Sequence, residues 1–481
     1  MSTDATRREG VDFLSPLRLL RSWYEGVFDA FLGVLLLFLG FTRRWLLSLG
    51  ADASFWLLAV LVFGMAAFNR DFGRVGIAPV YITEVILALL LVMATPRLLG
   101  GGTLWLPRQP AARRIIVILA LYVIYGLLRL SPSILFGGGD LLEALRNFAL
   151  FYYGIFGLIG WWILQGPLGK KRLDILLWGI VVVSTLTNTY FACSFILTAG
   201  VVDDPYVKVI SGQAALFSLF SALILFAVLL HGAFQVKDNP VFFGAAIGAL
   251  LLHVTLIFFS GHRSGLLALA AAMGVVWLSG KRRLRLNFRW AVVAFLFAVL
   301  ILSWGSVDAY FKLISQKYET FFQLSDEPNA AWRLVMWIRL LTLWSSSPIF
   351  GVGFGYDFAT QEPWGVMTEE RIDPHNSYVA ILARTGIVGL GFVLYVLWSV
   401  GRLLMRLKRE MRQNSDLFLA DSLLGCLTAV AVYASMNVIL ETPYHGIFFW
   451  LLMGMAAALA EYESKSDHRI EPRTGALSVA R

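Results

Sequence analysis

Long apolar runs, separated by short polar or basic stretches, recur along the chain from residue 27 to residue 462. A helix that crosses the hydrocarbon core of a bilayer needs about 20 mostly apolar residues. The chain is 58% hydrophobic and 15% charged, whereas soluble domains are about 45–50% apolar and about 25% charged. A soluble fold would also need an unusually large core, because single cores stop growing at about 250–300 residues. The sequence therefore predicts an all-α polytopic membrane protein.

The apolar runs predict twelve membrane spans, at 54–69, 80–96, 115–130, 148–165, 173–200, 213–235, 241–260, 264–280, 289–307, 378–402, 417–440 and 445–462. A further apolar stretch, residues 27–41, is short and is followed at once by Arg43 and Arg44. It is either a thirteenth span or an amphipathic helix that lies in the membrane interface. The expected fold class is thus about 12, or 13, transmembrane helices with one long, partly helical periplasmic loop.

Basic residues are divided unevenly between the two sets of loops. The loops on one side hold 18 Lys and Arg residues, and the short loops on the other side hold six. Because cytoplasmic loops carry the excess of positive charge, the first set is predicted to be cytoplasmic, together with the polar C-terminal tail. If residues 27–41 do not cross, the basic N-terminus is cytoplasmic too, which favours twelve crossings. Spread over loops in this way, the net charge of +9 is a topology signal and does not indicate nucleic-acid binding.

This arrangement predicts five segments along the chain: a cytoplasmic N-terminus with a short apolar helix (1–53), a first transmembrane block (54–307), a periplasmic loop that forms a cap (308–377), a C-terminal transmembrane block (378–462) and a cytoplasmic polar tail (463–481). The loop holds five basic and nine acidic residues, and loops of this length are usually functional or disordered. Several tryptophans argue against disorder. Residues 329–344 predict a helix with Trp337, Leu340 and Trp344 at helical spacing, which ends at Ser345–Pro348.

The first candidate site is the turn Ser260-Gly-His-Arg-Ser-Gly265, which lies between two spans on the outer side. Arg263 has His262, Ser260 and Ser264 as neighbours, and its planar guanidinium could hold two phosphate oxygens at once. The alternative is that Arg263 only extends its charged end from a span boundary to water. The turn by itself does not decide between these interpretations.

The second candidate lies on the loop helix, where Arg333 follows Trp332 and Arg339 comes two turns later. These arginines could form a second phosphate clamp on a helix that lies against the bilayer. They could equally be solvated residues beside an interfacial tryptophan.

The third candidate is Asp373-Pro-His375-Asn376-Ser-Tyr378, where the loop re-enters the membrane. His375 is one of six histidines in the chain, and imidazole is the side chain best suited to accept a proton near neutral pH. Loop histidines are nevertheless more often bystanders than catalysts. Asn376 and Tyr378 are expected to support this site.

Other ionisable residues fall in or at the ends of spans. Glu84 and Glu441 are kept as supporting candidates, because ionisable groups in membrane segments are often functional. Asp421 is expected to lie near an interface with water, and His231 and His253 are expected to be packed or hydrogen-bonded in the interior. The glycine cluster Gly351-Val-Gly-Phe-Gly355 follows no strand of a βαβ unit and is rejected as a nucleotide site. Its expected role is to let the chain fold tightly over the membrane surface.

Four motifs in order carry a resemblance to a known family: Ser-x-x-Arg-Ser-Gly at 260–265, Arg333 with Trp337, Pro348-Ile-Phe-Gly-Val-Gly-Phe-Gly355, and His375-Asn-Ser-Tyr378 followed by Gly386-Ile-Val-Gly-Leu390. Together they resemble the O-antigen ligase and polysaccharide polymerase superfamily of bacterial inner-membrane proteins. The specific resemblance covers roughly residues 240–400. One departure is His262, where the family more usually has serine directly before the arginine.

The resemblance implies transfer of a glycan from an undecaprenyl-diphosphate carrier to an acceptor sugar hydroxyl on the periplasmic side, in lipopolysaccharide or exopolysaccharide biosynthesis. Arg263 and Arg333, with Arg339 beside them, would bind the diphosphate, and His375 would activate the acceptor, with His262 as the alternative base. A single displacement would invert the anomeric centre. The acceptor would be lipid A core or a growing polysaccharide. No cofactor is expected, and the loop has no Asp-x-Asp pair or His/Cys cluster that would indicate a metal site.

Two alternatives to a ligase stay open. A repeat-unit polymerase of the same superfamily would use the same chemistry on a different acceptor. A multispan transporter for a lipid or solute would use the loop as a lid, but such proteins tend to show paired halves with interrupted helices, and the sequence has no such symmetry.

Overall fold

The computed structural model describes residues 53–77, 80–99, 106–135, 141–166, 168–198, 210, 212–231, 240–260, 262–279, 328–355, 375–411 and 414–470. The chain divides into two compact units, Met1–Trp56 and Leu57–Arg481, and nearly all of the first lies outside the described residues. The apolar stretch 27–41 and the expected span 289–307 also lie outside them.

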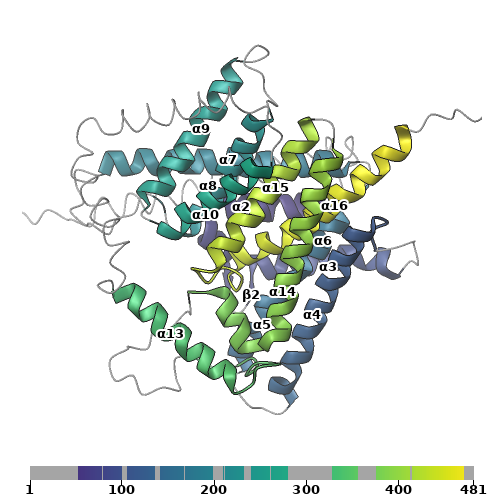
Figure 1. The fold of residues 1–481 in the computed structure, drawn as a ribbon, viewed down its shortest axis with the longest axis vertical. Coiled ribbons are helices and arrows are strands. Elements are labelled where there is room, and N and C mark those ends of the chain that lie inside the picture. Colours follow the sequence, from purple (N-terminus) through teal and green to yellow (C-terminus); the bar gives the residue numbers. More distant parts are fainter. Residues whose placement is uncertain are drawn as a thin grey trace, which may run out of the picture. The chain divides into compact units, whose positions relative to one another are not determined.

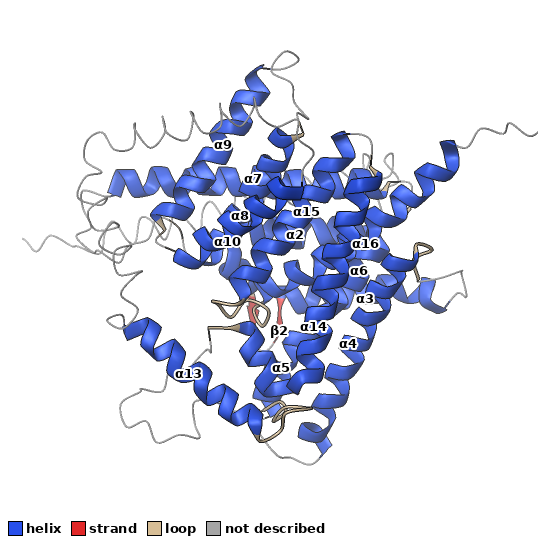
Figure 2. Ribbon diagram, in the orientation of Figure 1, coloured by secondary structure: helices blue, strands red, loops and turns tan. Residues whose placement is uncertain are grey.

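Helices make up nearly all of the described structure, as Figures 1 and 2 show. In chain order they are α2 (Ala53–Gly73), α3 (Ile82–Leu99), α4 (Pro110–Leu135), α5 (Leu141–Tyr152), α6 (Gly154–Leu164), α7 (Gly169–Thr198), α8 (Gly212–Leu230), α9 (Pro240–Phe259), α10 (Arg263–Ser279), α13 (Pro328–Ser345), α14 (Ser377–Glu410), α15 (Asn414–Ala434) and α16 (Pro443–Ile470). A short antiparallel hairpin of β1 (Gly76–Ile77) and β2 (Val80–Tyr81) connects α2 to α3 and is red in Figure 2.

Within the described residues, eight helical segments are long and apolar enough to cross a membrane: Ala53–Gly73, Pro110–Ser131, Glu143–Leu164, Gly169–Phe195, Pro240–Phe259, Ser377–Glu410, Asp416–Ala434 and Pro443–Ser464. Three shorter apolar helices are Ile82–Ala94, Ala214–Leu230 and Arg263–Ser279. Each of these segments coincides with one of the spans expected from the sequence. The helical, multi-pass fold is therefore confirmed, and the number of twelve crossings stays a prediction.

Helices α6 and α16 approach each other closely through glycines. A Cβ added to Gly454 on α16 would lie 2.2 Å from the carbonyl oxygen of Gly157 on α6, and one added to Gly157 would lie 2.8 Å from that of Trp450. Only residues without a side chain allow the two backbones to come this near. Small residues serve the same purpose in other membrane helix pairs, where close van der Waals packing drives association.

Helix α14 is broken at Gly386, whose φ of 67° and ψ of −168° are not helical. The glycine-containing segment Pro348–Gly355 lies along this break. Backbone hydrogen bonds join the two: Val352 N to Ala383 O, Gly353 N to Arg384 O, Ile387 N to Pro348 O and Val388 N to Ile349 O. A Cβ on Gly386 would lie 2.1 Å from the carbonyl oxygen of Ile349, so the close approach needs glycine. The glycines thus let the segment Pro348–Gly355 fold tightly, and this segment packs against the break in α14.

One expectation about a carboxylate is wrong. Asp421 is expected near water, but it is fully buried, forms an ion pair with Lys408 of α14 and lies within hydrogen-bond distance of His231, at 2.5 Å. The Lys408 ammonium also donates to Ser279 at the end of α10. Because a buried charge needs charged or hydrogen-bonding partners, the neighbouring helices supply what water would supply at an interface. His231 is therefore a hydrogen-bonded interior residue, as expected, and His253 is another, bonded to Asn188.

Candidate functional site

His375 immediately precedes α14, in the left-handed region of backbone conformation with a φ of 45°. The next residue, Asn376, caps the helix, because its side-chain oxygen accepts from the amides of Tyr378 at 3.0 Å and Val379 at 3.2 Å. A non-glycine residue with positive φ costs free energy and is often found at functional sites. The cap and the strained residue before it fix the imidazole at the start of the helix.

The pKa of His375 is lowered from its usual value, first by burial and then by the positive charge of Arg333. Both effects disfavour the imidazolium form. His375 is therefore neutral at neutral pH and can accept a proton. The structure thus brings together two residues that the sequence places 42 positions apart, the candidate base and one candidate phosphate ligand.

Ser377 and Asn437 connect the start of α14 to the start of α10. The Ser377 hydroxyl donates to the carbonyl of Asn437 at 3.1 Å and accepts from the amide of Ile439 at 3.0 Å. The side-chain amide of Asn437 then donates to the hydroxyl of Ser264 at 3.0 Å. Hydrogen bonds therefore tie the His375 end of α14 to the Arg263 end of α10 through the segment between α15 and α16.

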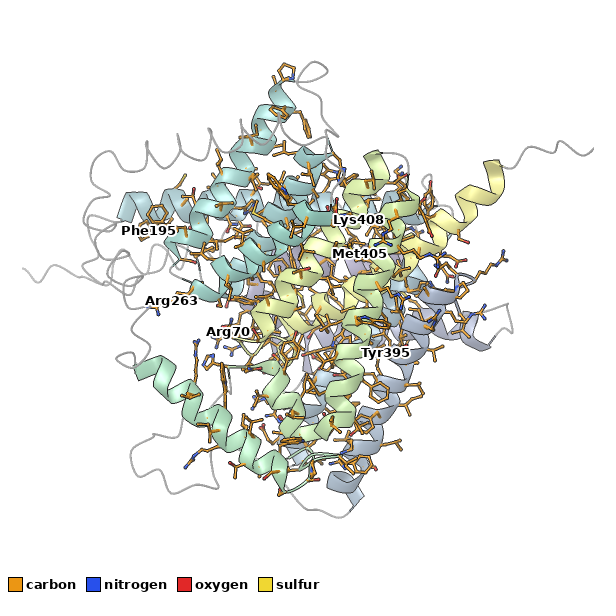
Figure 3. The ribbon with its side chains drawn as sticks, in the orientation of Figure 1. Arg70, Phe195, Arg263, Tyr395, Met405 and Lys408 are labelled. Atoms are coloured by element: carbon orange, nitrogen blue, oxygen red, sulfur yellow. The ribbon has the colours of Figure 1, made fainter. Side chains whose placement is uncertain are left out.

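The turn at 260–265 starts helix α10. Ser260 is buried and its hydroxyl donates to the carbonyl of Ile257 at 2.7 Å, while the carbonyl of His262 accepts the first helical amides, those of Gly265 and Leu266. Arg263 is the first residue of the helix and is only partly buried; Figure 3 shows it there, far from Lys408 near the end of α14. A helix N-terminus carries partial positive charge, which adds to that of the guanidinium.

Helix α13 presents Arg333 to both parts of this cluster. Met336 and Leu340 pack against Ala383 of α14, and Figure 1 draws the two helices side by side. Arg333 acts electrostatically on His375 and also on Tyr433 of α15, whose phenol is hydrogen-bonded to Ser264. The helix predicted at 329–344 is confirmed to within one residue at each end, and it carries the Arg333 that acts on His375 and Tyr433.

The remaining predicted residues have different surroundings. Arg339 lies six residues after Arg333, which is about two-thirds of a turn further round α13, so it lies on another face of that helix. The Tyr378 hydroxyl donates to the carbonyl of Ala431 at 2.9 Å and so joins α14 to α15. Glu441 accepts from Arg384 at 2.8 Å in an ion pair in which both side chains are largely covered.

Glu84 stands in the first turn of α3, where three donors hold its carboxylate. The Tyr152 hydroxyl donates to one oxygen at 2.7 Å. The other oxygen accepts from the Thr83 hydroxyl at 2.7 Å and from the amide of Tyr81 at 3.1 Å. Its partners therefore come from β2, α3 itself and α5, and they include neither His375 nor an arginine among the contacts described.

Three residues that connect parts of the candidate site, Asn437, Tyr433 and Arg384, are not among the candidates named from the sequence. The first two fall inside the expected span 417–440, whereas in the structure α15 ends at Ala434 and a non-helical segment follows it. The signal lay in Asn437-Val-Ile-Leu-Glu-Thr-Pro443, where polar residues and a proline interrupt two apolar runs. Proline is common in the first turn of a helix, and Pro443 begins α16.

Residues 247–394 match the family described as O-antigen ligase. The family resemblance inferred from the four motifs is thereby confirmed. The chain matches no curated protein. The O-antigen ligase segment contains Arg263, Arg333 and His375, whereas Asn437 and Tyr433, which connect them, lie outside it.

Proposed function

We propose that the chain transfers a glycan from an undecaprenyl-diphosphate carrier to an acceptor sugar hydroxyl at the periplasmic face of the bacterial inner membrane. The single observation that carries the proposal is the electrostatic interaction of Arg333 with a neutral, partly buried His375, inside the segment that matches O-antigen ligases. This transfer needs a proton acceptor and an anion-binding group, and the two candidates for these roles interact electrostatically.

His375 is proposed as the general base. Its lowered pKa keeps the imidazole unprotonated at neutral pH, so that it can take the proton of the attacking hydroxyl. The rigid cap at Asn376 favours this role over that of a bystander, because a base must be held in hydrogen-bond reach of its substrate. His262 remains the alternative base, since it lies one residue before Arg263.

Arg263 and Arg333 are proposed to bind the diphosphate, with Arg339 as a further contact. The two arginines belong to one connected cluster, because Arg333 acts on Tyr433, which is bonded to Ser264 next to Arg263. Guanidinium groups grip two phosphate oxygens at once and stabilise the charge that develops on the leaving group. Ser260 and Ser264 support the turn that carries Arg263.

The reaction that follows is a single displacement. The acceptor oxygen forms a bond to the anomeric carbon, the bond from that carbon to the carrier phosphate breaks, and His375 takes the hydroxyl proton. The lipid diphosphate leaves with the electron pair, and the configuration at the anomeric carbon inverts. Two arginines stabilise the negative charge that builds on the departing diphosphate, so the proposed transfer needs no divalent metal.

The test is transfer by purified protein with the lipid-diphosphate glycan of the producing cell as donor and chelator present. A positioned base contributes about 10²–10⁴-fold in rate, so His375→Ala should lose that much activity while the protein accumulates normally. His262→Ala is the matched variant. Parent-like transfer by His375→Ala beside an inactive His262→Ala would move the base to the 260–265 turn. If both single variants transfer like the parent, the double variant decides: an inactive double variant shows that either histidine can serve as the base, and an active one excludes a histidine base.

Two further arms complete the experiment. Arg263→Lys and Arg333→Lys keep the charge but lose the planar fork, so both should be strongly impaired. Near-parent transfer by both lysine variants would contradict diphosphate binding. Lipid A core and lipid-linked repeat units are offered as separate acceptors, because a ligase uses the first and a polymerase the second.

A further inference from the structure

The Glu84 carboxylate and three tyrosines form a continuous polar wall. Tyr152 donates to Glu84 at 2.7 Å, and its phenol is also hydrogen-bonded to that of Tyr153, with ring centroids 4.6 Å apart. Tyr153 in turn packs against the start of α16 two residues after Tyr444, because a Cβ added to Gly446 would lie 3.1 Å from its ring. We call Glu84, Tyr152, Tyr153 and Tyr444 the tyrosine wall. Its members come from α3, α5, α16 and the junction between α5 and α6.

The tyrosine wall reaches the cluster proposed for catalysis. The Tyr433 phenol is hydrogen-bonded to Ser264, the neighbour of Arg263. His445, which follows Tyr444, stacks edge-on against it at 4.5 Å and lies 6.4 Å from the Tyr433 ring. The rings of His445 and Tyr433, which are themselves buried, therefore join the tyrosine wall to the part of the structure that carries Arg263.

The tyrosine wall and the proposed diphosphate-binding arginines differ in charge. Arg263 and Arg333 are cationic, whereas Glu84 is an acid whose carboxylate is held by three hydrogen-bond donors. A diphosphate would be repelled by the carboxylate, so the part of a substrate that lies against the tyrosine wall must be uncharged or hydroxyl-rich. Sugars meet this requirement, since their hydroxyls donate to carboxylates and exchange hydrogen bonds with phenols, and their C–H faces pack on aromatic rings.

The four residues of the tyrosine wall differ in solvent exposure, as expected for a binding surface. Tyr153 is buried, with 3% of its surface exposed, and supports the others from behind. Glu84, Tyr152 and Tyr444 are partly exposed. Partly covered polar groups backed by a rigid aromatic layer are typical of specificity-determining positions in ligand sites.

We propose that the tyrosine wall is a sugar-binding subsite, with Glu84 and Tyr152 as its specificity-determining residues. The inference rests on the proposed function, and it assigns the sugar part of the substrate to α3, α5 and α16. The sugar belongs either to the lipid-linked donor or to the acceptor, which share this chemistry.

The test uses Glu84→Gln and Tyr152→Phe, which keep side-chain size but remove the charge or the hydroxyl. Apparent KM values for donor and acceptor are measured separately, together with kcat. A lost hydrogen bond to a charged group costs about 1.5–3 kcal/mol, so the KM for one substrate should rise about tenfold or more with a smaller change in kcat. The substrate whose KM rises identifies the source of the sugar.

Matched controls are Glu410→Gln and Tyr395→Phe, which make the same chemical changes at exposed positions of α14. KM values within twofold of the parent for both wall variants would overturn the subsite. So would a lowered unfolding temperature without any KM change, because that pattern describes a purely structural carboxylate.

A second readout separates this proposal from the proposed function. The probe is the oligosaccharide released by mild acid from the cell's lipid-linked glycan, and its binding is measured by saturation-transfer NMR without turnover. Binding that Glu84→Gln abolishes would support the subsite even if the protein transferred no glycan. Active transfer with oligosaccharide binding that is absent, or unchanged in both variants, would remove the subsite and leave the transferase.

Discussion

At the scale of single residues, the candidate site depends on His375 and on what surrounds it. Its φ of 45° puts the imidazole directly before a capped helix, where burial and Arg333 both lower its pKa. The same arginine that is proposed to bind the diphosphate therefore also keeps the base unprotonated. Binding of an anionic diphosphate at Arg333 would offset part of this effect and make His375 more basic at the moment of reaction.

The pH dependence of transfer tests this coupling. Because the pKa of His375 is lowered from 6.5, the parent should lose activity only as the pH falls below that value, when the imidazole becomes protonated. Arg333→Gln removes one cause of the lowered pKa of His375, so that pKa should rise. The acid limb of the normalised kcat/KM profile should then move to higher pH. Arg333→Lys keeps the charge and should leave the limb in place. An acid limb at the same pH in the parent and in Arg333→Gln would contradict electrostatic coupling between the two residues.

At the scale of elements, the break in α14 determines where the O-antigen ligase motifs meet. Gly386 turns the helix, and the segment Pro348–Gly355 hydrogen-bonds along the break. The Tyr125 hydroxyl donates to the carbonyl of Thr385 at 2.7 Å, and Arg129 donates to that of Gly351 at 3.1 Å, so α4 fastens both sides. The position of His375 at the start of α14 is thus fixed by contacts about ten residues further along the helix.

Gly386→Ala should therefore be costly. The new Cβ would lie 2.1 Å from the carbonyl oxygen of Ile349 in a backbone conformation that L side chains rarely adopt, so we expect a loss of about 1–3 kcal/mol in stability and reduced transfer. Gly391→Ala is the matched control, because that glycine lies in the same helix and its Cβ would meet no atom within 4 Å. Thermal unfolding in detergent is the measurement. Equal unfolding midpoints for the two variants would show that the break does not require glycine.

At the scale of the whole molecule, the distribution of charge predicts which end of the bundle does chemistry. The buried Asp421 and its partners Lys408 and His231 lie near the end of α14 that the basic loops place in the cytoplasm. His375 stands before the opposite end of the same helix. If the positive loops are cytoplasmic, the candidate site faces the periplasm, where a lipid-linked glycan would be presented.

Orientation can be measured directly. Alkaline phosphatase fused within residues 320–330 should be active, because that loop is predicted to be periplasmic. Green fluorescent protein fused after residue 463 should fluoresce, because the tail is predicted to be cytoplasmic. The predicted orientation would be reversed if the phosphatase fused in the loop were inactive and green fluorescent protein fused at the same position fluoresced. The candidate site would then not face the periplasm.

Apolar runs along the sequence determined the spans, because about 20 consecutive apolar residues have no better environment than a bilayer. The eight long and three short helices of the described residues follow from that pattern. The spacing of Trp337, Leu340 and Trp344 likewise determined α13, and four local motifs determined the family. All of these signals are local, since each depends on residues within a few turns of one another.

The tertiary structure alone decided which distant residues meet. Asn437 links Ser377 to Ser264, Asp421 meets Lys408 and His231 in the interior, and Glu84 meets Tyr152. These partners lie from 13 to 190 residues apart, so no periodicity connects them. Each of these polar groups is removed from water and needs a hydrogen-bonding or charged partner, and helix packing determines which residue that partner is. The sequence could therefore name the residues of the candidate site, and only packing could determine which of them act together.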